Sequence, residues 1–162
     1  MKQRIVIAQA LLNDPKLIIV DEPTVGLDPQ ERNNFRQLLT ELAGDRCIIF
    51  STHIVSDVES IADEIAIMQS GCLLQTASPN ELKAKVAKKC WKLTADFSEL
   101  NQFQHDFIIS HSVRKQDKIE LDLVADYCPD ERAVSRTPSL EDAYLHFSQQ
   151  TSTNGEFARV GS

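Results

Sequence analysis

Short, unbroken apolar runs alternate with amphipathic stretches through the first half of the chain. Residues 17–20 (Leu-Ile-Ile-Val) and 47–50 (Cys-Ile-Ile-Phe) contain no alternating polar position. This pattern is typical of strands buried on both faces of a parallel sheet, and it predicts that Cys47 is a small buried hydrophobe. Between the two runs, apolar side chains recur at helical spacing over residues 29–43. We therefore predict a strand–helix–strand unit.

Local capping signals indicate where the helices begin. Asp28 precedes Pro29 and stands three residues before Glu31, the arrangement of an N-cap, a first helical residue and a reciprocal cap. Pairs of the same kind are Ser56 with Glu59 and Ser78 with Glu81. We expect helices to start at these three places. A further helical pattern covers residues 1–12 and stops at Asn13-Asp14-Pro15.

The next segment has the pattern of a hairpin. Residues 65–68 form a third apolar run, and the turn pair Ser70-Gly71 leads into residues 72–76. The order strand, helix, strand, helix, strand up to this point indicates an α/β core with a mainly parallel sheet.

The character of the sequence changes near residue 88. Residues 91–95, 107–109 and 119–123 are typical of short strands, two of them alternating as half-exposed antiparallel strands do, and Ser139 is placed to cap a last helix. We predict three parts: a first domain over residues 1–87, a small α+β accessory module over 88–150, and a disordered polar tail over 151–162.

Composition and charge exclude some classes of function. The net charge of −7 and the isoelectric point near 5.0 argue against a nucleic-acid binder. No apolar run approaches the roughly 20 residues that cross a bilayer, so any membrane contact would go through partners. The four cysteines form no C-x-x-C pair, which favours a reduced, cytoplasmic protein. His105, His111 and His146 have no ligand-spaced partners, and we expect them at the surface.

Reactive side chains follow both of the first two predicted strands. Asp21 and Glu22 come directly after one strand, and Ser51-Thr52-His53 end the other. Ligands of parallel sheets bind at the carboxyl edge of the strands, where these groups would converge if the strands are neighbours. Two carboxylates and an imidazole suit Mg²⁺ and a general base, and therefore attack of water on a phosphate ester.

These residues also carry a family resemblance. Residues 17–29 (Leu-Ile-Ile-Val-Asp-Glu-Pro-Thr-Val-Gly-Leu-Asp-Pro) resemble the Walker B strand and D-loop of ATP-binding-cassette (ABC) ATPases. Ser51-Thr52-His53 is similar to the switch histidine of that family, and residues 1–11 to the helix that follows its Ser-Gly-Gly signature. The resemblance implies a partial P-loop NTPase core over residues 1–87.

The resemblance implies a role for each matching residue. Asp21 would hold Mg²⁺ through water, Glu22 would polarise the attacking water, and His53 would contact the γ-phosphate of ATP. Three further residues would touch the opposite subunit of a nucleotide-sandwich dimer: Gly26, Leu27 and Asp28. Asp28 is also explained by its N-cap position alone, and both roles are compatible.

Several elements of the family are missing from the sequence, the phosphate-binding loop above all. No G-x-x-x-x-G-K-[ST] loop occurs, although that loop supplies the amide cradle and the lysine for the β- and γ-phosphates. We therefore expect a C-terminal fragment of an ABC ATPase that neither binds ATP tightly nor hydrolyses it alone. We also expect the exposed side of its sheet to promote association. A shortened clone, an internal start at Met1 and an interrupted gene are all compatible with the sequence.

The end of the chain points to a type of transporter. Residues 138–145 (Pro-Ser-Leu-Glu-Asp-Ala-Tyr-Leu) are similar to the closing motif of a small module that follows the ATPase in many bacterial exporter subunits. The resemblance implies an ATP-hydrolysing subunit, peripheral on the inner face of the cell membrane. Its partners would be transmembrane permease subunits and a second ATPase subunit. The alternatives are an interaction module that binds no nucleotide, or a DNA-repair or ribosome-acting ABC ATPase, which the acidic charge disfavours.

Overall fold

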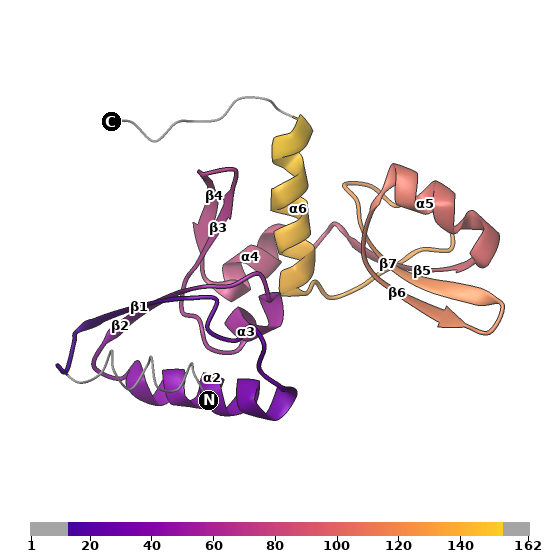
Figure 1. Cartoon of the computed structure of the whole chain (residues 1–162). Coiled ribbons are helices and arrows are strands. Elements are labelled where there is room, and N and C mark those ends of the chain that lie inside the picture. Colours follow the sequence, from indigo (N-terminus) through magenta and orange to yellow (C-terminus); the bar gives the residue numbers. More distant parts are fainter. Residues whose placement is uncertain (1–12, 154–162) are drawn as a thin grey trace. The chain divides into compact units, whose positions relative to one another are not determined.

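The computed structural model describes residues 13–153, and these divide into two compact units after Ile61 (Figure 1). The helix predicted over residues 1–12 lies outside the described residues. So does most of the predicted tail, although the last helix continues to Thr153, three residues into that segment. Each unit is described by itself below.

The first unit is a parallel strand pair with a helix packed on one face. Strands β1 (Leu17–Asp21) and β2 (Cys47–Ser51) pair in parallel register, with Leu17 opposite Cys47 and Asp21 opposite Ser51. Helix α2 (Pro29–Leu42) runs along this pair in Figure 1, and a short helix, α3 (Val55–Glu59), follows β2. The core of the unit consists of buried Phe35 and Leu39 with, packed against them, Leu27, Leu38, Leu42, Ile48, Phe50 and Ile61.

The other face of the strand pair is open, contrary to the prediction of strands buried on both faces. Leu17, Ile19 and Ile49 are exposed by 50%, 69% and 53%. Cys47 is also exposed, so its predicted burial is wrong. Side chains alternate between the faces of a strand, and α2 covers only the face that carries Ile48 and Phe50.

The helix starts follow the capping predictions in two of three cases. The Oδ1 atom of Asp28 accepts a hydrogen bond from the Glu31 amide at 2.8 Å, and Pro29 opens α2. Helix α4 (Pro79–Lys85) has the complete reciprocal pair of Ser78 and Glu81. Ser56 is no cap, because α3 starts one residue before it. The Thr52 hydroxyl instead accepts the Ile54 amide at 3.0 Å and turns the chain into α3.

The second unit begins with the predicted hairpin. Strands β3 (Ile65–Gln69) and β4 (Cys72–Ala77) are antiparallel, and Ser70 (φ 51°) and Gly71 (φ 78°) form the turn between them. Positive φ at both central residues is the geometry of a two-residue hairpin turn. Such a turn can join only antiparallel strands, since a parallel pair needs a long crossover.

The remaining strands form an antiparallel sheet. Strands β5 (Cys90–Asp96), β6 (Ile108–Lys115), β7 (Lys118–Val124) and β8 (Val134–Ser135) lie in the order β6-β7-β5-β8. A 3₁₀ turn, η1 (Phe97–Glu99), and helix α5 (Leu100–Asp106) connect β5 to β6, and α5 lies against the sheet in Figure 1. Its core is Leu93, Ala95, Phe103, Ile119, Leu121 and Leu123. The predicted mainly parallel sheet is therefore not confirmed: within residues 13–153 only β1 and β2 are parallel.

Helix α6 (Leu140–Thr153) is held by a buried ion pair at its first turn. The guanidinium of Arg136 donates to both oxygens of Asp142, at 2.8 and 2.6 Å, and Asp142 is fully buried. The amide and hydroxyl of Ser139 also donate to Asp142. The Pro-Ser-Leu-Glu-Asp motif therefore caps α6, and Arg136 forms an ion pair with the aspartate of this cap. Because α6 contacts both α4 and β6, residue 88 lies inside one compact unit. The functional boundary predicted there stays a prediction.

One buried residue of α6 corrects a prediction. His146 is only 7% exposed, although the sequence placed it at the surface. Its Nε2 atom lies 3.2 Å from the Lys89 ammonium, which pairs in turn with Asp126 at 2.7 Å. His146 stands six residues after Leu140 and three after Ala143, both buried, so it continues the inner face of the helix.

Candidate functional site

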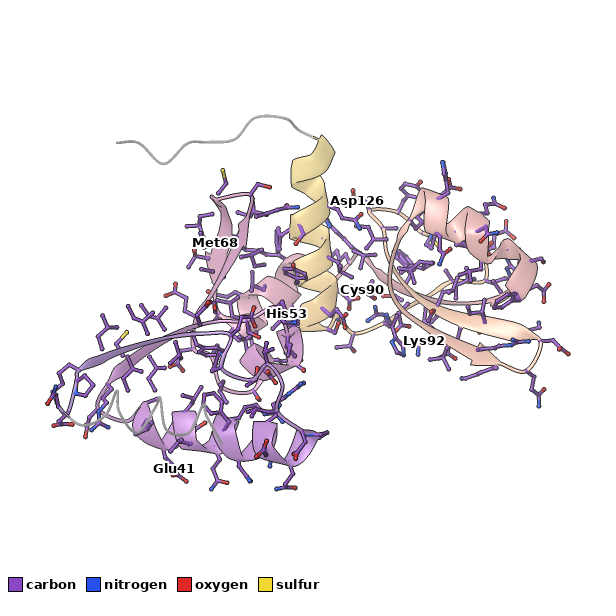
Figure 2. All side chains as sticks on the ribbon, viewed as in Figure 1. Glu41, His53, Met68, Cys90, Lys92 and Asp126 are labelled. Atoms are coloured by element: carbon purple, nitrogen blue, oxygen red, sulfur yellow. The ribbon has the colours of Figure 1, made fainter. Side chains whose placement is uncertain are left out.

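The candidate site lies where β1 and β2 end. Because these strands are parallel neighbours in register, their carboxyl ends coincide, and Asp21 stands directly opposite Ser51. The Ser51 hydroxyl donates a hydrogen bond to the Oδ1 atom of Asp21. His53, labelled in Figure 2, follows two residues after β2 ends. The structure thus places the predicted groups at one edge of the strand pair.

Glu22 joins this edge through its backbone and its side chain. Its amide lies 3.1 Å from the Ser51 carbonyl oxygen and 3.0 Å from the Ser51 hydroxyl oxygen. Its Oε1 atom lies 2.9 Å from the Nδ1 atom of His53. An ionised carboxylate only accepts hydrogen bonds, so Nδ1 carries the proton in this contact, and Nε2 of a neutral ring is an acceptor. The side chains of Glu22 and His53 are 36% and 69% exposed, so water and ligands can reach them.

The backbone of Glu22 has an uncommon conformation. Its φ angle of 43° lies in the left-handed region, which a residue with a Cβ adopts at a cost of about 1–3 kcal/mol. Strain of this kind persists where surrounding bonds hold it, and it clusters at functional sites. The two acceptors from Ser51 hold it here. The turn carries the Glu22 side chain off the line of the strand and toward His53.

The second carboxylate oxygen of Glu22 differs from the first in its hydrogen bonding. The Oε2 atom of Glu22 is buried and has no hydrogen-bond partner among the described residues. A buried acceptor without a partner is costly, by about 1–3 kcal/mol, unless a water or an ion completes it. This oxygen is therefore the acceptor of the site that still needs a donor.

The site offers only part of a metal coordination sphere. Among residues 13–153, no three His, Cys, Asp or Glu side chains are grouped so as to hold a metal. Asp21, Glu22 and Ser51 instead present hard oxygen atoms at one edge. Mg²⁺ prefers oxygen ligands, and it commonly takes one or two carboxylates and completes its octahedron with water and phosphate. The donor set fits Mg²⁺ in that partial way.

The other predicted site residues lie in the turn between β1 and α2. Gly26 has a φ angle of 75°, a conformation that strains any side chain, although a Cβ there would meet no atom within 4 Å. Leu27 packs against Phe35 and Leu39, and Asp28 caps α2. These contacts are local, and the predicted contact of Gly26, Leu27 and Asp28 with a second subunit stays a prediction.

Ser51 is the residue that sequence reasoning undervalued. The Ser-Thr-His triplet was expected to bring His53 to the site, and no separate role was expected for the serine. The useful signal was the register: if two parallel strands begin their apolar runs together, the fifth residue of each stands side by side. That alignment pairs Ser51 with Asp21.

The described residues contain no helix that is both long and apolar enough to cross a membrane.

The curated proteins that the chain resembles are named as ATP-binding proteins of transport systems. It is 31% identical over 157 residues to the Nod factor export ATP-binding protein I of Bradyrhizobium diazoefficiens, a match that covers 90% of this chain and 51% of that protein. Identity to the uncharacterized ABC transporter ATP-binding protein YdbJ of Bacillus subtilis is 34% over 171 aligned positions, covering 96% and 54%.

A third relative belongs to a differently named system. The energy-coupling factor transporter ATP-binding protein EcfA2 of Staphylococcus aureus is 36% identical over 118 residues, which is 71% of this chain and 41% of that protein. No family model matches the chain. The chain spans about half the length of the curated relatives it matches.

Proposed function

Because this chain belongs to the family of ABC transporter ATP-binding proteins, we propose that it supplies the water-activating half of a Mg²⁺-dependent ATPase site. The observation that supports this proposal is the convergence of Asp21, Glu22 and His53 at the carboxyl edge of β1 and β2. The family uses ATP to energise transport, and ATP hydrolysis requires a water that attacks the γ-phosphate in line.

Each side chain has a distinct task in this proposal. Asp21 orients the metal ion through water, with its Oδ1 atom already fixed by Ser51. The ion that Asp21 would hold in this way would supply positive charge to neutralise the phosphates. The Glu22 carboxylate, whose side chain is 36% exposed, accepts the proton of the attacking water. His53 donates from Nδ1 to the Oε1 atom of Glu22, and a ring that carries a proton on Nε2 as well would donate from that atom to a phosphate oxygen.

The partners and location extend the proposal beyond one chain. We propose that the subunit pairs with a second ATPase subunit and with transmembrane permease subunits. It would lie peripherally on the inner face of the cell membrane. Export is the favoured direction, since one relative is named for Nod factor export and residues 138–145 resemble the closing motif of exporter subunits. A relative named for an energy-coupling factor transporter leaves the direction for experiment.

A second candidate function has one observation in its favour. The sequence contains no G-x-x-x-x-G-K-[ST] loop, so the chain has no phosphate cradle of its own. If no partner protein supplies such a loop, the chain would bind no nucleotide and would act only as an interaction module. The two functions differ in what happens when a phosphate-binding segment is supplied.

Complementation tests this difference directly. The chain is mixed with a separately expressed ABC ATPase segment chosen because its sequence contains a G-x-x-x-x-G-K-[ST] loop, and binding of a fluorescent ATP analogue and Mg²⁺-dependent ATP hydrolysis are measured. We expect neither activity with the chain alone and both with the mixture. Asp21→Asn should abolish the hydrolysis, whereas Asp45→Asn, an exposed aspartate outside the site, should not. Micromolar binding by the chain alone, or a mixture that binds no ATP, contradicts the proposal.

A further inference from the structure

The Ser51 hydroxyl connects both acidic residues of the site. It donates its single proton to the Oδ1 atom of Asp21, and its oxygen accepts the Glu22 amide at 3.0 Å. A hydroxyl has one proton to donate and two lone pairs, so these two bonds use its proton and one lone pair. Two neighbouring residues whose side chains point in different directions are thus tied to one atom on the next strand.

The bond to Glu22 is not required by strand pairing. The Ser51 carbonyl oxygen already accepts the Glu22 amide at 3.1 Å, as any residue at this position would allow. The hydroxyl gives the same amide a second acceptor. Glu22, which carries this amide, directly follows β1 and has a left-handed backbone. It therefore stabilises the conformation that aims Glu22 at His53.

The hydroxyl also contributes little to the stability of the unit. Ser51 is exposed, so water can replace either hydrogen bond when the hydroxyl is removed. Exposed polar groups that exchange a protein partner for water change the free energy of unfolding only slightly. A hydroxyl that is dispensable for folding and bonded to both acidic residues is better explained by their orientation.

We propose that Ser51 is a positioning residue that sets the relative orientation of the Asp21 and Glu22 carboxylates. This inference rests on the proposed ATPase function. It assigns Ser51 no contact with ATP or with the reacting atoms. Its effect is to hold Glu22 in contact with His53 while the same hydroxyl donates to Asp21. A misplacement of about 1 Å in a reacting group can slow a reaction by about a hundredfold.

Kinetics of the complemented chain give the first test, using Ser51→Ala, Ser51→Thr and Glu22→Gln. Ser51→Ala should lower kcat for ATP by about tenfold to a hundredfold with little change in KM, because it disturbs orientation and not binding. Ser51→Thr keeps a hydroxyl and should restore most of the rate. Ser112→Ala, which removes an exposed strand serine elsewhere, serves as control. A Ser51→Ala rate equal to wild type, while Glu22→Gln is inactive, overturns the inference and leaves the proposed function intact.

If the mixture shows no hydrolysis at all, that result counts against the proposed function itself. A second readout, which needs no hydrolysis, then decides the inference about Ser51. In the full chain alone, nitrogen-15 spectra of the His53 ring report whether Nδ1 carries the proton and donates to Glu22. We expect this Nδ1–H form in wild type and Ser51→Thr, and its loss in Ser51→Ala and in Glu22→Ala, which removes the acceptor. An unchanged His53 ring in Ser51→Ala overturns the positioning role, whatever the ATPase assay shows.

Discussion

The Nδ1 atom of His53 lies 2.9 Å from the Oε1 atom of Glu22, although 31 residues separate them in sequence. Parallel pairing of β1 and β2 in register brings them together, because it aligns the ends of the two strands. The left-handed turn at Glu22 then directs its side chain away from the strand. The contact is one consequence of strand register, so it exists within this chain without any ligand or partner.

The N-cap of α2 provides a test of local structure at Asp28. Asp28→Ala removes the acceptor of the Glu31 amide and should lower the free energy of unfolding by about 1 kcal/mol. Asp28→Asn retains an acceptor and should cost only a few tenths. Urea denaturation followed by circular dichroism checks both. Equal losses for alanine and asparagine would assign the effect to the charge and not to the cap.

The ion pair of Arg136 and Asp142 should dominate the stability of the second unit. Burial alone would raise the pKa of Asp142, but hydrogen bonds from Arg136, Ser110 and Ser139 outweigh it and hold that pKa below its usual value. Asp142→Asn removes the closer of the two carboxylates that pair with the 15%-exposed Arg136 and leaves only Asp122, at 3.4 Å, so it should cost about 3 kcal/mol.

Thermal unfolding of Asp142→Asn can be compared with a matched surface change. Asp14→Asn removes an ion pair with Arg46 in which the Asp14 side chain is 75% exposed, and such pairs are worth at most about 1 kcal/mol. If both variants lose the same small amount, the Arg136–Asp142 pair does not hold α6 as described.

His146 should make the stability of the second unit depend on pH. Burial, and then the nearby Lys89 ammonium, lower the pKa of His146 below its ordinary value of 6.5. The unfolded chain therefore binds a proton more readily than the folded one, and stability rises with pH through that range. This contribution is fully present above pH 6.5 and is lost as the pH falls below it.

Denaturation curves between about pH 5 and pH 8 measure this effect. His146→Gln should flatten the dependence, whereas His111→Gln, which changes an exposed histidine of β6, should leave it as in wild type. A wild-type stability that does not fall below pH 6.5, or that falls equally in His146→Gln, contradicts the assignment.

The open face of β1 and β2 should cause the chain to associate when it is alone. Leu17, Ile19 and Ile49 expose contiguous apolar surface on neighbouring strands. Apolar patches of this kind drive association unless they are covered. Light scattering should show dimers or larger species, and Ile19→Thr should reduce them while preserving strand propensity. Leu73→Thr, at an exposed position of β4, is the control, and a monodisperse wild-type monomer refutes the prediction.

The sequence predicted the meeting of two strand ends better than it predicted the sheets. Apolar runs located β1, β2 and β3, and the expected convergence of the residues after β1 and β2 at one edge agrees with their parallel register, whereas the roles of those residues stay predictions. The hairpin of β3 with β4 was predicted correctly, but β3 was also counted toward a mainly parallel sheet, because a buried apolar strand has the same pattern in a parallel sheet and in a hairpin. The turn at Ser70-Gly71 decided the matter in favour of β4.

Burial was the least predictable property, and Cys47 and His146 show why. Cys47 lies in an apolar run, but it faces the side of the strand pair that no described element covers. His146 is polar, but it lies on the inner face of α6. In both cases exposure depends on which face of the strand or helix the residue occupies, and not on the polarity of its side chain. Strand β8 and helix α5 were missed because short elements carry little periodic signal.

The central claim is that Glu22 activates the water that attacks ATP. The most direct measurement is a single-turnover experiment on the complemented chain with radiolabelled ATP and Mg²⁺, comparing wild type, Glu22→Gln and Glu31→Gln. Glu31 is a neighbouring glutamate in the first turn of α2 and serves as the matched control. We predict that Glu22→Gln retains bound ATP while its rate of conversion to ADP falls by about a hundredfold or more, with Glu31→Gln like wild type. Conversion by Glu22→Gln at the wild-type rate would contradict the claim.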